Sequence, residues 1–362
     1  RLYQTPINID PDNPSVPLAH PLIFSNYLAK SLGPFTTLGI AEDSWGVNEG
    51  ILSDEGYVQQ CLLFHEERKE IFFDTLDTVQ DGLVAFVFDL TDRMQHMFLG
   101  RSLEGPDASH DIPAEVEETY IRADSLLGEI VDELDDDDVL MVLSDHGFAR
   151  FHRCVDLNRW LHKEGYLAIN PDSSPDDHWS ERIDWSRTRA YAFGLSGMYL
   201  NLKGREGQGI VEPGEEAEAL KAEIVSQLQD LTDPETGEPV VVDTFDAEKV
   251  YRGPYTRNAP DLISGFKRGY RVSWESAVGD IADEVFFDND RAWAADHGMA
   301  PTEVPGVFFS NRQIEAERLW IGDLAPTILG LFGIDKPGYM DGHAHPVSDY
   351  AATDIDRDQA AH

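Results

Sequence analysis

The stretch Val139-Leu-Met-Val-Leu-Ser144-Asp145-His146-Gly147 decides the fold class that we expect for this chain of 362 residues. Five apolar residues run directly into an adjacent Asp-His pair and a glycine. Such a short apolar run is typical of a strand that is buried on both faces, as in a parallel sheet. Ligand-binding groups of open α/β sheets gather beyond the carboxyl ends of these strands. Asp145 and His146 stand at that position, and they offer the oxygen and nitrogen ligands that suit zinc or a similar divalent ion.

A second apolar run, Leu83-Val-Ala-Phe-Val-Phe88-Asp89, precedes another polar cluster that contains Asp92 and His96. Residues 113–134 lie between the two runs and carry an apolar stripe at helical spacing. A strand, a helix and a strand of these lengths predict a βαβ unit with a right-handed crossover. Both polar clusters are therefore expected at the same edge of one parallel sheet.

The remaining pattern predicts an α/β fold, a mostly parallel sheet flanked by helices with an inserted α+β cap. We assign residues 1–167 and 280–362 to the core and residues 168–279 to the cap, where turn-forming clusters separate short strands and one amphipathic helix. Apolar periodicity and capping residues predict helices over 24–32, 54–79, 113–134, 156–163, 215–231 and 323–332.

The candidate ligands come from three separate segments. Asp92 and His96 are four residues apart, which places both on one face of a helix and close enough to share an ion. Taken alone, this spacing also fits an aspartate at a helix start and a surface histidine. Asp145 and His146 at a neighbouring strand end favour the metal interpretation, and His297, which precedes Gly298, is a third contributor. For the C-terminal histidines at 343 and 345 a polar turn is the simpler interpretation.

Composition restricts the partners of the chain. There are 68 acidic and 28 basic residues, only 8 of them lysine, and the net charge is −40. Few lysines and abundant carboxylates indicate a surface adapted to high salt, although an ordinary acidic protein is the alternative. This charge argues against binding nucleic acid or anionic membranes. An anionic substrate would need local positive charge, which bound metal ions supply.

The apolar runs and the cysteines bear on the cellular compartment of the protein. No apolar run approaches the roughly 20 residues of a membrane span, and Cys61 and Cys154 do not form a disulfide framework. We therefore expect a reducing, cytoplasmic setting; the oligomeric state is not indicated. The chain begins at Arg1 and enters an irregular segment, so we expect that a preceding piece is missing.

Taken together, the motifs resemble those of the alkaline phosphatase superfamily. The resemblance rests on Asp92-Arg-Met-Gln-His96, Ser144-Asp-His-Gly-Phe148, Asp296-His297-Gly298 before Pro305-Gly-Val-Phe-Phe-Ser310, and the helix at 323–332 with Met340-Asp-Gly. The pattern is most similar to the type I phosphodiesterase/nucleotide pyrophosphatase branch, whose members are described as phosphohydrolases or phosphomutases. The resemblance covers most of the chain and implies an alkaline-phosphatase-like core.

The resemblance also implies a two-metal site with zinc, or manganese in some branches. Asp92, His96 and His297 would bind one ion, and Asp145 and His146 would bind the other. The second ion would also need an aspartate and a Thr or Ser nucleophile, both expected upstream of residue 1. We therefore expect residues 1–362 alone to be catalytically weak or inactive.

The implied function is a metal-dependent phosphoric ester hydrolase that acts on small phosphorylated substrates, phosphodiesters or pyrophosphates, by two-metal phosphoryl transfer. A phosphomutase of the same superfamily and a non-catalytic metal-binding member are the alternatives. The sequence does not identify the alcohol portion of the substrate.

Overall fold

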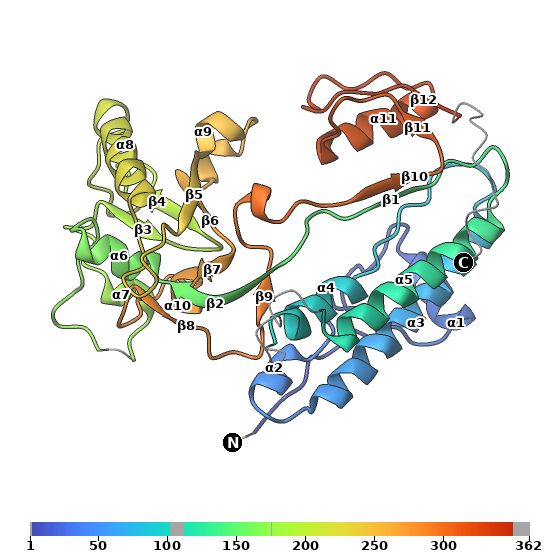
Figure 1. Ribbon diagram of the computed structural model, residues 1–362, viewed down its shortest axis with the longest axis horizontal. Coiled ribbons are helices and arrows are strands. Elements are labelled where there is room, and N and C mark those ends of the chain that lie inside the picture. The colour runs from blue at the N-terminus through green and yellow to red at the C-terminus, as the bar shows by residue number, and fades with distance from the viewer. Residues whose placement is uncertain (1, 102–111, 175, 350–362) are drawn as a thin grey trace. The chain divides into compact units, whose positions relative to one another are not determined.

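The computed structural model describes residues 2–101, 112–174 and 176–349. The chain divides into two compact units, and each is described by itself. The first unit comprises Arg1–Leu126 and Phe148–Val304, and the second comprises Leu127–Gly147 and Pro305–His362. Figure 1 labels the helices and strands of both. Helices alternate with several small sheets, which confirms the predicted α/β class.

The first unit contains most of the regular structure. Its helices are α1 (Ile23–Ser31), α2 (Ser44–Asn48), α3 (Asp54–Thr78), α4 (Leu90–Met94), the π-helix η1 (Gln95–Leu99), α5 (Ala114–Glu133, which continues into the second unit), α6 (Leu157–Lys163), α7 (Trp179–Arg182), α8 (Glu215–Gln229), α9 (Ala247–Val250), η2 (Thr256–Asn258), α10 (Trp274–Ala277) and η3 (Pro301–Glu303). Its strands are β2 (Ala149–Val155), β3 (Ala190–Ala192), β4 (Gly197–Leu200), β5 (Val241–Asp246), β6 (Leu262–Phe266), β7 (Gly269–Val272), β8 (Phe286–Asp288) and β9 (Ala295–Asp296).

The second unit contains the C-terminal elements and the end of α5. Its elements are β1 (Met141–Leu143), β10 (Phe308–Ser310), β11 (Gln313–Ile314), η4 (Ile321–Asp323), α11 (Leu324–Leu331) and β12 (Val347–Ser348). β1 pairs antiparallel with β10, and β11 pairs antiparallel with β12.

The long helix α3 begins where its sequence predicts. The Ser53 hydroxyl accepts a hydrogen bond from the backbone N–H of Gly56 at 3.1 Å, which satisfies one of the free donors of the first turn. The buried side chains of Tyr57 and Cys61 in α3 pack with Met94 of α4 and Phe98 of η1. This small core fixes the α4–η1 segment against α3.

Two sheets organise the rest of the first unit. In one, β2 lies between β7 and β8, with a parallel β2–β7 pair and antiparallel partners in β8 and β9. The other has the order β3-β4-β6-β5 and is antiparallel. Among the strands that the structure describes, the pairing is therefore more antiparallel than the sequence predicts, and β2–β7 is the parallel pair.

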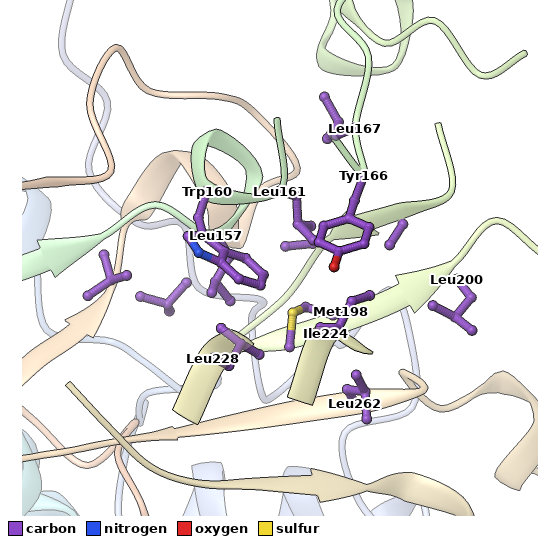
Figure 2. Packing of buried hydrophobic residues seen from close by; sticks show 14 of the residues in the cluster. Leu157, Trp160, Leu161, Tyr166, Leu167, Met198, Leu200, Ile224, Leu228 and Leu262 are labelled. Atoms are coloured by element: carbon purple, nitrogen blue, oxygen red, sulfur yellow. The ribbon is translucent and has the colours of Figure 1, made fainter. Parts of the chain in front are cut away.

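The largest core joins α6, α8 and the β3-β4-β6-β5 sheet. Trp160 and Tyr166 point toward Met198 of β4 and toward Ile224 and Leu228 of α8 (Figure 2). Ile224 and Leu228 are fully buried and four residues apart, which is the spacing of one helix face. The division into a core and a cap at 168–279 stays a prediction.

The predicted strand at residues 83–88 is wrong. This segment is extended but belongs to no strand in the described part of the chain, so the expected βαβ unit is not formed. Phe86 and Phe88 pack on Phe72 of α3 with ring centroids 5.5 and 5.6 Å apart, whereas Leu83 and Val87 are 57% and 78% exposed. The run is thus buried on one face only. No described helix has both the length and the apolarity that a membrane span requires.

Candidate metal centre

Asp92 and His96 lie on consecutive turns of one helical segment. Asp92 belongs to α4 and His96 to the π-helix η1 that continues it. Asp92 Oδ1 is 3.4 Å from His96 Nε2, while Asp92 Oδ2 contacts Arg93 Nη1 at 2.9 Å. One carboxylate oxygen therefore remains directed at the histidine. Single π-helical turns of this kind occur frequently at functional sites.

His297 reaches the same carboxylate from a distant part of the sequence. It directly follows β9, which pairs antiparallel with β2 so that Asp296 lies opposite Ala149. His297 Nε2 is 3.9 Å from Asp92 Oδ1, and the rings of His96 and His297 are 5.1 Å apart. The structure thus brings together three of the residues that the sequence predicts as ligands.

Close backbone packing holds the His297 segment against η1. Ala294 N–H donates to the His96 carbonyl at 2.9 Å, and His96 Nδ1 lies 2.8 Å from the Ala295 carbonyl. A Cβ on Gly100 would lie 1.8 Å from the Ala294 carbonyl oxygen, so glycine is required at this contact. Because a carbonyl only accepts, His96 Nδ1 donates to Ala295, and this bond directs Nε2 toward Asp92.

Aromatic rings fix the orientation of both imidazoles. Trp293 stacks on His96 with centroids 3.6 Å apart, and Phe148 meets His96 edge-on at 4.7 Å. Phe148 also meets the His297 ring edge-on at 5.3 Å. His96 is only 2% exposed, whereas the His297 side chain is 30% exposed. The centre is consequently closed on the His96 side and open at His297.

The electrostatics favour an ionised Asp92. Burial raises the pKa of Asp92, but its contact with His96 and the positive charges of Arg93 and His297 outweigh burial and hold that pKa below its ordinary value. Glu42 lies behind Arg93, with 3.4 Å between Oε2 and Arg93 Nε, and burial raises the pKa of Glu42.

Asp296 supports the turn that carries His297. Its Oδ1 accepts from the N–H groups of His297 at 2.7 Å and Gly298 at 3.0 Å. Its Oδ2 accepts from Arg271 Nε at 2.5 Å and Trp293 Nε1 at 3.0 Å. Burial raises the pKa of Asp296, but Arg271 and these hydrogen bonds overcome it and lower the pKa to about 2.

Asp145 and His146 belong to the second unit. They follow β1, as predicted, and Ser144 continues the β1–β10 pairing through bonds of 3.0 and 2.9 Å with Val307. Asp145 Oδ2 is 3.4 Å from His146 Nε2, and His146 Nδ1 is 3.1 Å from the Gly147 carbonyl. The Asp145 side chain is 76% exposed. Their role as ligands stays a prediction.

The histidines near the C-terminus surround a buried aspartate of the second unit. Asp323 Oδ1 accepts from His343 N–H at 2.7 Å, and its Oδ2 lies 3.2 Å from His345 Nε2. The His345 N–H donates to Thr327 Oγ1 at 3.1 Å. These bonds fit the polar turn that we expected for this segment.

The chemistry of the donor set fits a divalent metal ion. Asp92, His96 and His297 present one carboxylate oxygen and two imidazole Nε2 atoms, which are ligands that zinc prefers. Donor atoms on a tetrahedral zinc ion with bonds of about 2.0–2.1 Å lie about 3.3–3.4 Å apart. Asp92 Oδ1 lies 3.4 Å from His96 Nε2, which matches that spacing, and 3.9 Å from His297 Nε2, which is longer. Three protein ligands would leave a fourth position for water or substrate.

Sequence reasoning missed the supporting residues Arg271, Trp293 and Gly100. Trp293 stands in the same short segment as His297, and its closeness to the motif was the available signal. Arg271 comes from β7, whose position beside β2 depends on strand pairing that is not local in the sequence. Gly100 gave no signal, because its role depends on a contact with a segment almost 200 residues away.

These features define an α/β protein with a candidate metal centre. A comparison with protein families identifies the family to which the chain belongs. The family model described as type I phosphodiesterase / nucleotide pyrophosphatase matches residues 28–287, well over half of the chain. The chain belongs to this family of phosphoric ester hydrolases. No curated protein matches it.

Solved structures with similarity include ectonucleotide pyrophosphatase / phosphodiesterase 5. The human protein is 16% identical, with 68% of this chain and 53% of that chain covered and a TM-score of 0.34. The murine protein is 14% identical, with coverage of 72% and 52% and a TM-score of 0.30. An inactive murine variant in complex with AMP is 15% identical, with coverage of 61% and 51% and a TM-score of 0.27. The chain spans about half the length of these proteins.

Proposed function

We propose that the intact protein is a metal-dependent hydrolase of phosphodiester or pyrophosphate bonds in small phosphorylated substrates. One observation carries the proposal: His96 Nε2 and His297 Nε2 both face Asp92 Oδ1, at 3.4 and 3.9 Å, in a member of this family. In this proposal Asp92, His96 and His297 bind one divalent ion, with zinc as the first candidate and manganese as the second. Asp145 and His146 contribute to a second ion.

A bound divalent ion would supply positive charge to the oxygens at phosphorus and would activate an oxygen nucleophile. The residues of the chain prepare the site for this role. The Ala295 carbonyl accepts from His96 Nδ1, so that Nε2 is the nitrogen that would bind the ion. Arg93 engages the second oxygen of Asp92, so that a single oxygen remains for the ion. In a chain with a charge of −40, the ion also offsets repulsion of an anionic substrate.

We also propose that residues 1–362 by themselves turn over little or no substrate. None of the five proposed ligands is a Thr or Ser, the residue types that the resemblance implies as the nucleophile of phosphoryl transfer through a covalent intermediate. Positioning and charge stabilisation by metal ligands are only part of such a mechanism.

The test combines metal content and turnover. Metal bound to residues 1–362 is measured by mass spectrometry after dialysis, and hydrolysis of a chromogenic phosphodiester is measured with the full-length protein. His297→Ala should lower both metal content and rate, and Asp145→Asn should lower the rate. His178→Ala is the matched control, because His178 is exposed and caps α7, away from the proposed ligands in the sequence. Unchanged metal content and rate in His297→Ala would refute the assignment.

We further propose a reducing, cytoplasmic setting at high salt. Cys61 and Cys154 are both buried free thiols, and burial raises the pKa of each to about 12, so neither is a reactive thiolate. Location of a tagged protein by cell fractionation would test the setting, and recovery in a secreted or membrane fraction would contradict it.

A further inference from the structure

Arg271 is a buried cation that the proposed ligand set does not include. It is 4% exposed and lies on β7, within the region that the sequence assigns to the cap. Its guanidinium lies 3.9 Å from the ring centroid of Trp274, and its Nη1 donates to the Val272 carbonyl at 2.9 Å. The planar group is therefore held by an aromatic face and by its own strand before it meets Asp296.

The Asp296 carboxylate transmits this position to the ligand turn. Both oxygens have two donors: Oδ1 accepts from the His297 and Gly298 backbone, and Oδ2 accepts from Arg271 and Trp293. The two backbone N–H groups set the direction in which the chain leaves β9. Because His297 directly follows Asp296, rotation of this carboxylate would move the His297 side chain relative to Asp92.

Trp293 connects the same carboxylate to the other histidine. Its indole N–H donates to Asp296 Oδ2 at 3.0 Å, and its ring stacks on His96 at 3.6 Å. The fixed Asp296 thus controls a wall of the His96 pocket as well as the His297 turn. One buried ion pair orients two of the three proposed ligands.

A buried ion pair gives little stability by itself, because desolvation of both charges offsets their attraction. A positional role accounts better for a pair that joins β7 to the turn of His297. The register of the parallel β2–β7 pair places Arg271 opposite Cys154 of β2, and Asp296 lies opposite Ala149 of the same strand. β2 therefore serves as the common support for the arginine and for its carboxylate partner.

We propose that Arg271 is a positioning residue that acts through Asp296 to hold His297, and through Trp293 to hold His96, in the geometry that binds the metal ion. This inference rests on the proposed metal site. Partners outside the ligand set that orient ligands in this way typically change metal affinity about 10–100-fold when they are removed.

The test uses residues 1–362 with Co²⁺ and Zn²⁺ as probes, at a salt concentration where the wild type is folded. Co²⁺ binding is followed by its visible absorption bands, which report the number and geometry of ligands, and Zn²⁺ affinity is measured by competition. We expect Arg271→Met to weaken Zn²⁺ binding about 10–100-fold and to change the Co²⁺ spectrum. Arg271→Lys should recover part of the affinity, because it keeps the charge but not the planar group.

Arg153→Met is the matched control. Arg153 is also a buried arginine in this sheet and is 7% exposed, but it donates to the buried Asp233 at 2.9 Å and to Asp288 at 2.8 Å. Its removal should destabilise the fold but leave the affinity and spectrum of the folded fraction unchanged. If Arg271→Met does not fold, Trp293→Phe, which keeps a ring but removes the N–H, replaces it with the same expectation.

The outcomes separate the two proposals. If the wild type binds neither ion, the proposed metal site is wrong. If the wild type binds both ions and the variants at Arg271 and Trp293 bind them with unchanged affinity and spectrum, the positioning role is wrong. A loss of affinity that Arg153→Met reproduces equally would assign Arg271 to the fold alone and would also overturn the inference.

Discussion

Asp156 should make the free energy of unfolding depend on pH. One substitution at this position should remove that contribution. Its side chain is fully buried, caps α6 by accepting from the Arg159 N–H at 2.6 Å, and accepts from the Ser273 hydroxyl at 2.6 Å. Burial raises the pKa of Asp156 from its ordinary value of 3.8 to about 6, although these hydrogen bonds oppose the shift. The folded protein therefore binds a proton at this carboxyl more tightly than the unfolded chain does.

The sign and size of the effect follow from linkage. For a raised pKa, the stability from protonation is fully present below pH 3.8 and is lost as the pH rises through about 6. A shift of roughly two units corresponds to about 3 kcal/mol as an upper value. Asp156→Asn resembles the neutral acid at every pH, because its oxygen still accepts from Arg159 and its amide donates to Ser273. We expect equal stability near pH 4, and at pH 7 a variant that is about 1–3 kcal/mol more stable.

The assay is urea unfolding at constant salt between pH 4 and 7.5, with the result plotted as variant minus wild type. Titrations of all other carboxyls cancel in this difference. Asp246→Asn is the control, because Asp246 also caps a helix, but Lys221 overcomes the effect of burial and lowers the pKa of Asp246. Because the pKa of Asp246 lies below 3.8, its difference should stay nearly constant over this pH range. A flat profile for Asp156→Asn, or one with the slope of the control, would refute the reasoning.

Three further outcomes are expected. Gly100→Ala should destabilise the fold by about 1–3 kcal/mol and weaken Zn²⁺ binding, because the new Cβ meets the Ala294 carbonyl. Gly128→Ala is the control and should do neither, because a Cβ there has no neighbour within 4 Å. Equal unfolding curves for the two variants would contradict the prediction. Arg153→Met should cost about 3–5 kcal/mol in urea unfolding, because the buried Asp233 loses its partner; a cost below 1 kcal/mol would count against it. The melting temperature should rise with KCl from dilute buffer to molar salt, since 68 acidic residues oppose 28 basic ones; equal values would reject adaptation to high salt.

The helices could be predicted from the sequence because their signals are local. Residues 54–79 carry a capping serine and helical periodicity, and the structure has α3 at Asp54–Thr78. The predicted helix at 215–231 is α8 at Glu215–Gln229, with three acidic residues in its first turn. In both cases the residues that decide the boundary lie within a few positions of it.

The strands were harder to predict because pairing is not local. The apolar runs at 83–88 and 139–143 look alike in sequence, yet only the second contains a strand, and it pairs with β10 in the antiparallel direction. A continuous apolar run fits a strand that is buried on both faces. It fits equally well an extended segment whose alternate side chains pack on a helix. Phe86 and Phe88 take the second arrangement against α3.

The candidate centre depends both on local spacing in the sequence and on strand pairing that is not local. The spacing of Asp92 and His96 is sufficient to predict their contact, because four residues make about one helical turn. The position of Arg271 depends instead on the β2–β7 register, which no spacing in the motif reveals. A substitution there leaves every proposed ligand in the sequence and alters the support of His297. If the positioning role holds, relatives with the same ligand motifs should differ in metal affinity according to the residue at this buried position, and the motif alone would not predict how tightly the ion is bound.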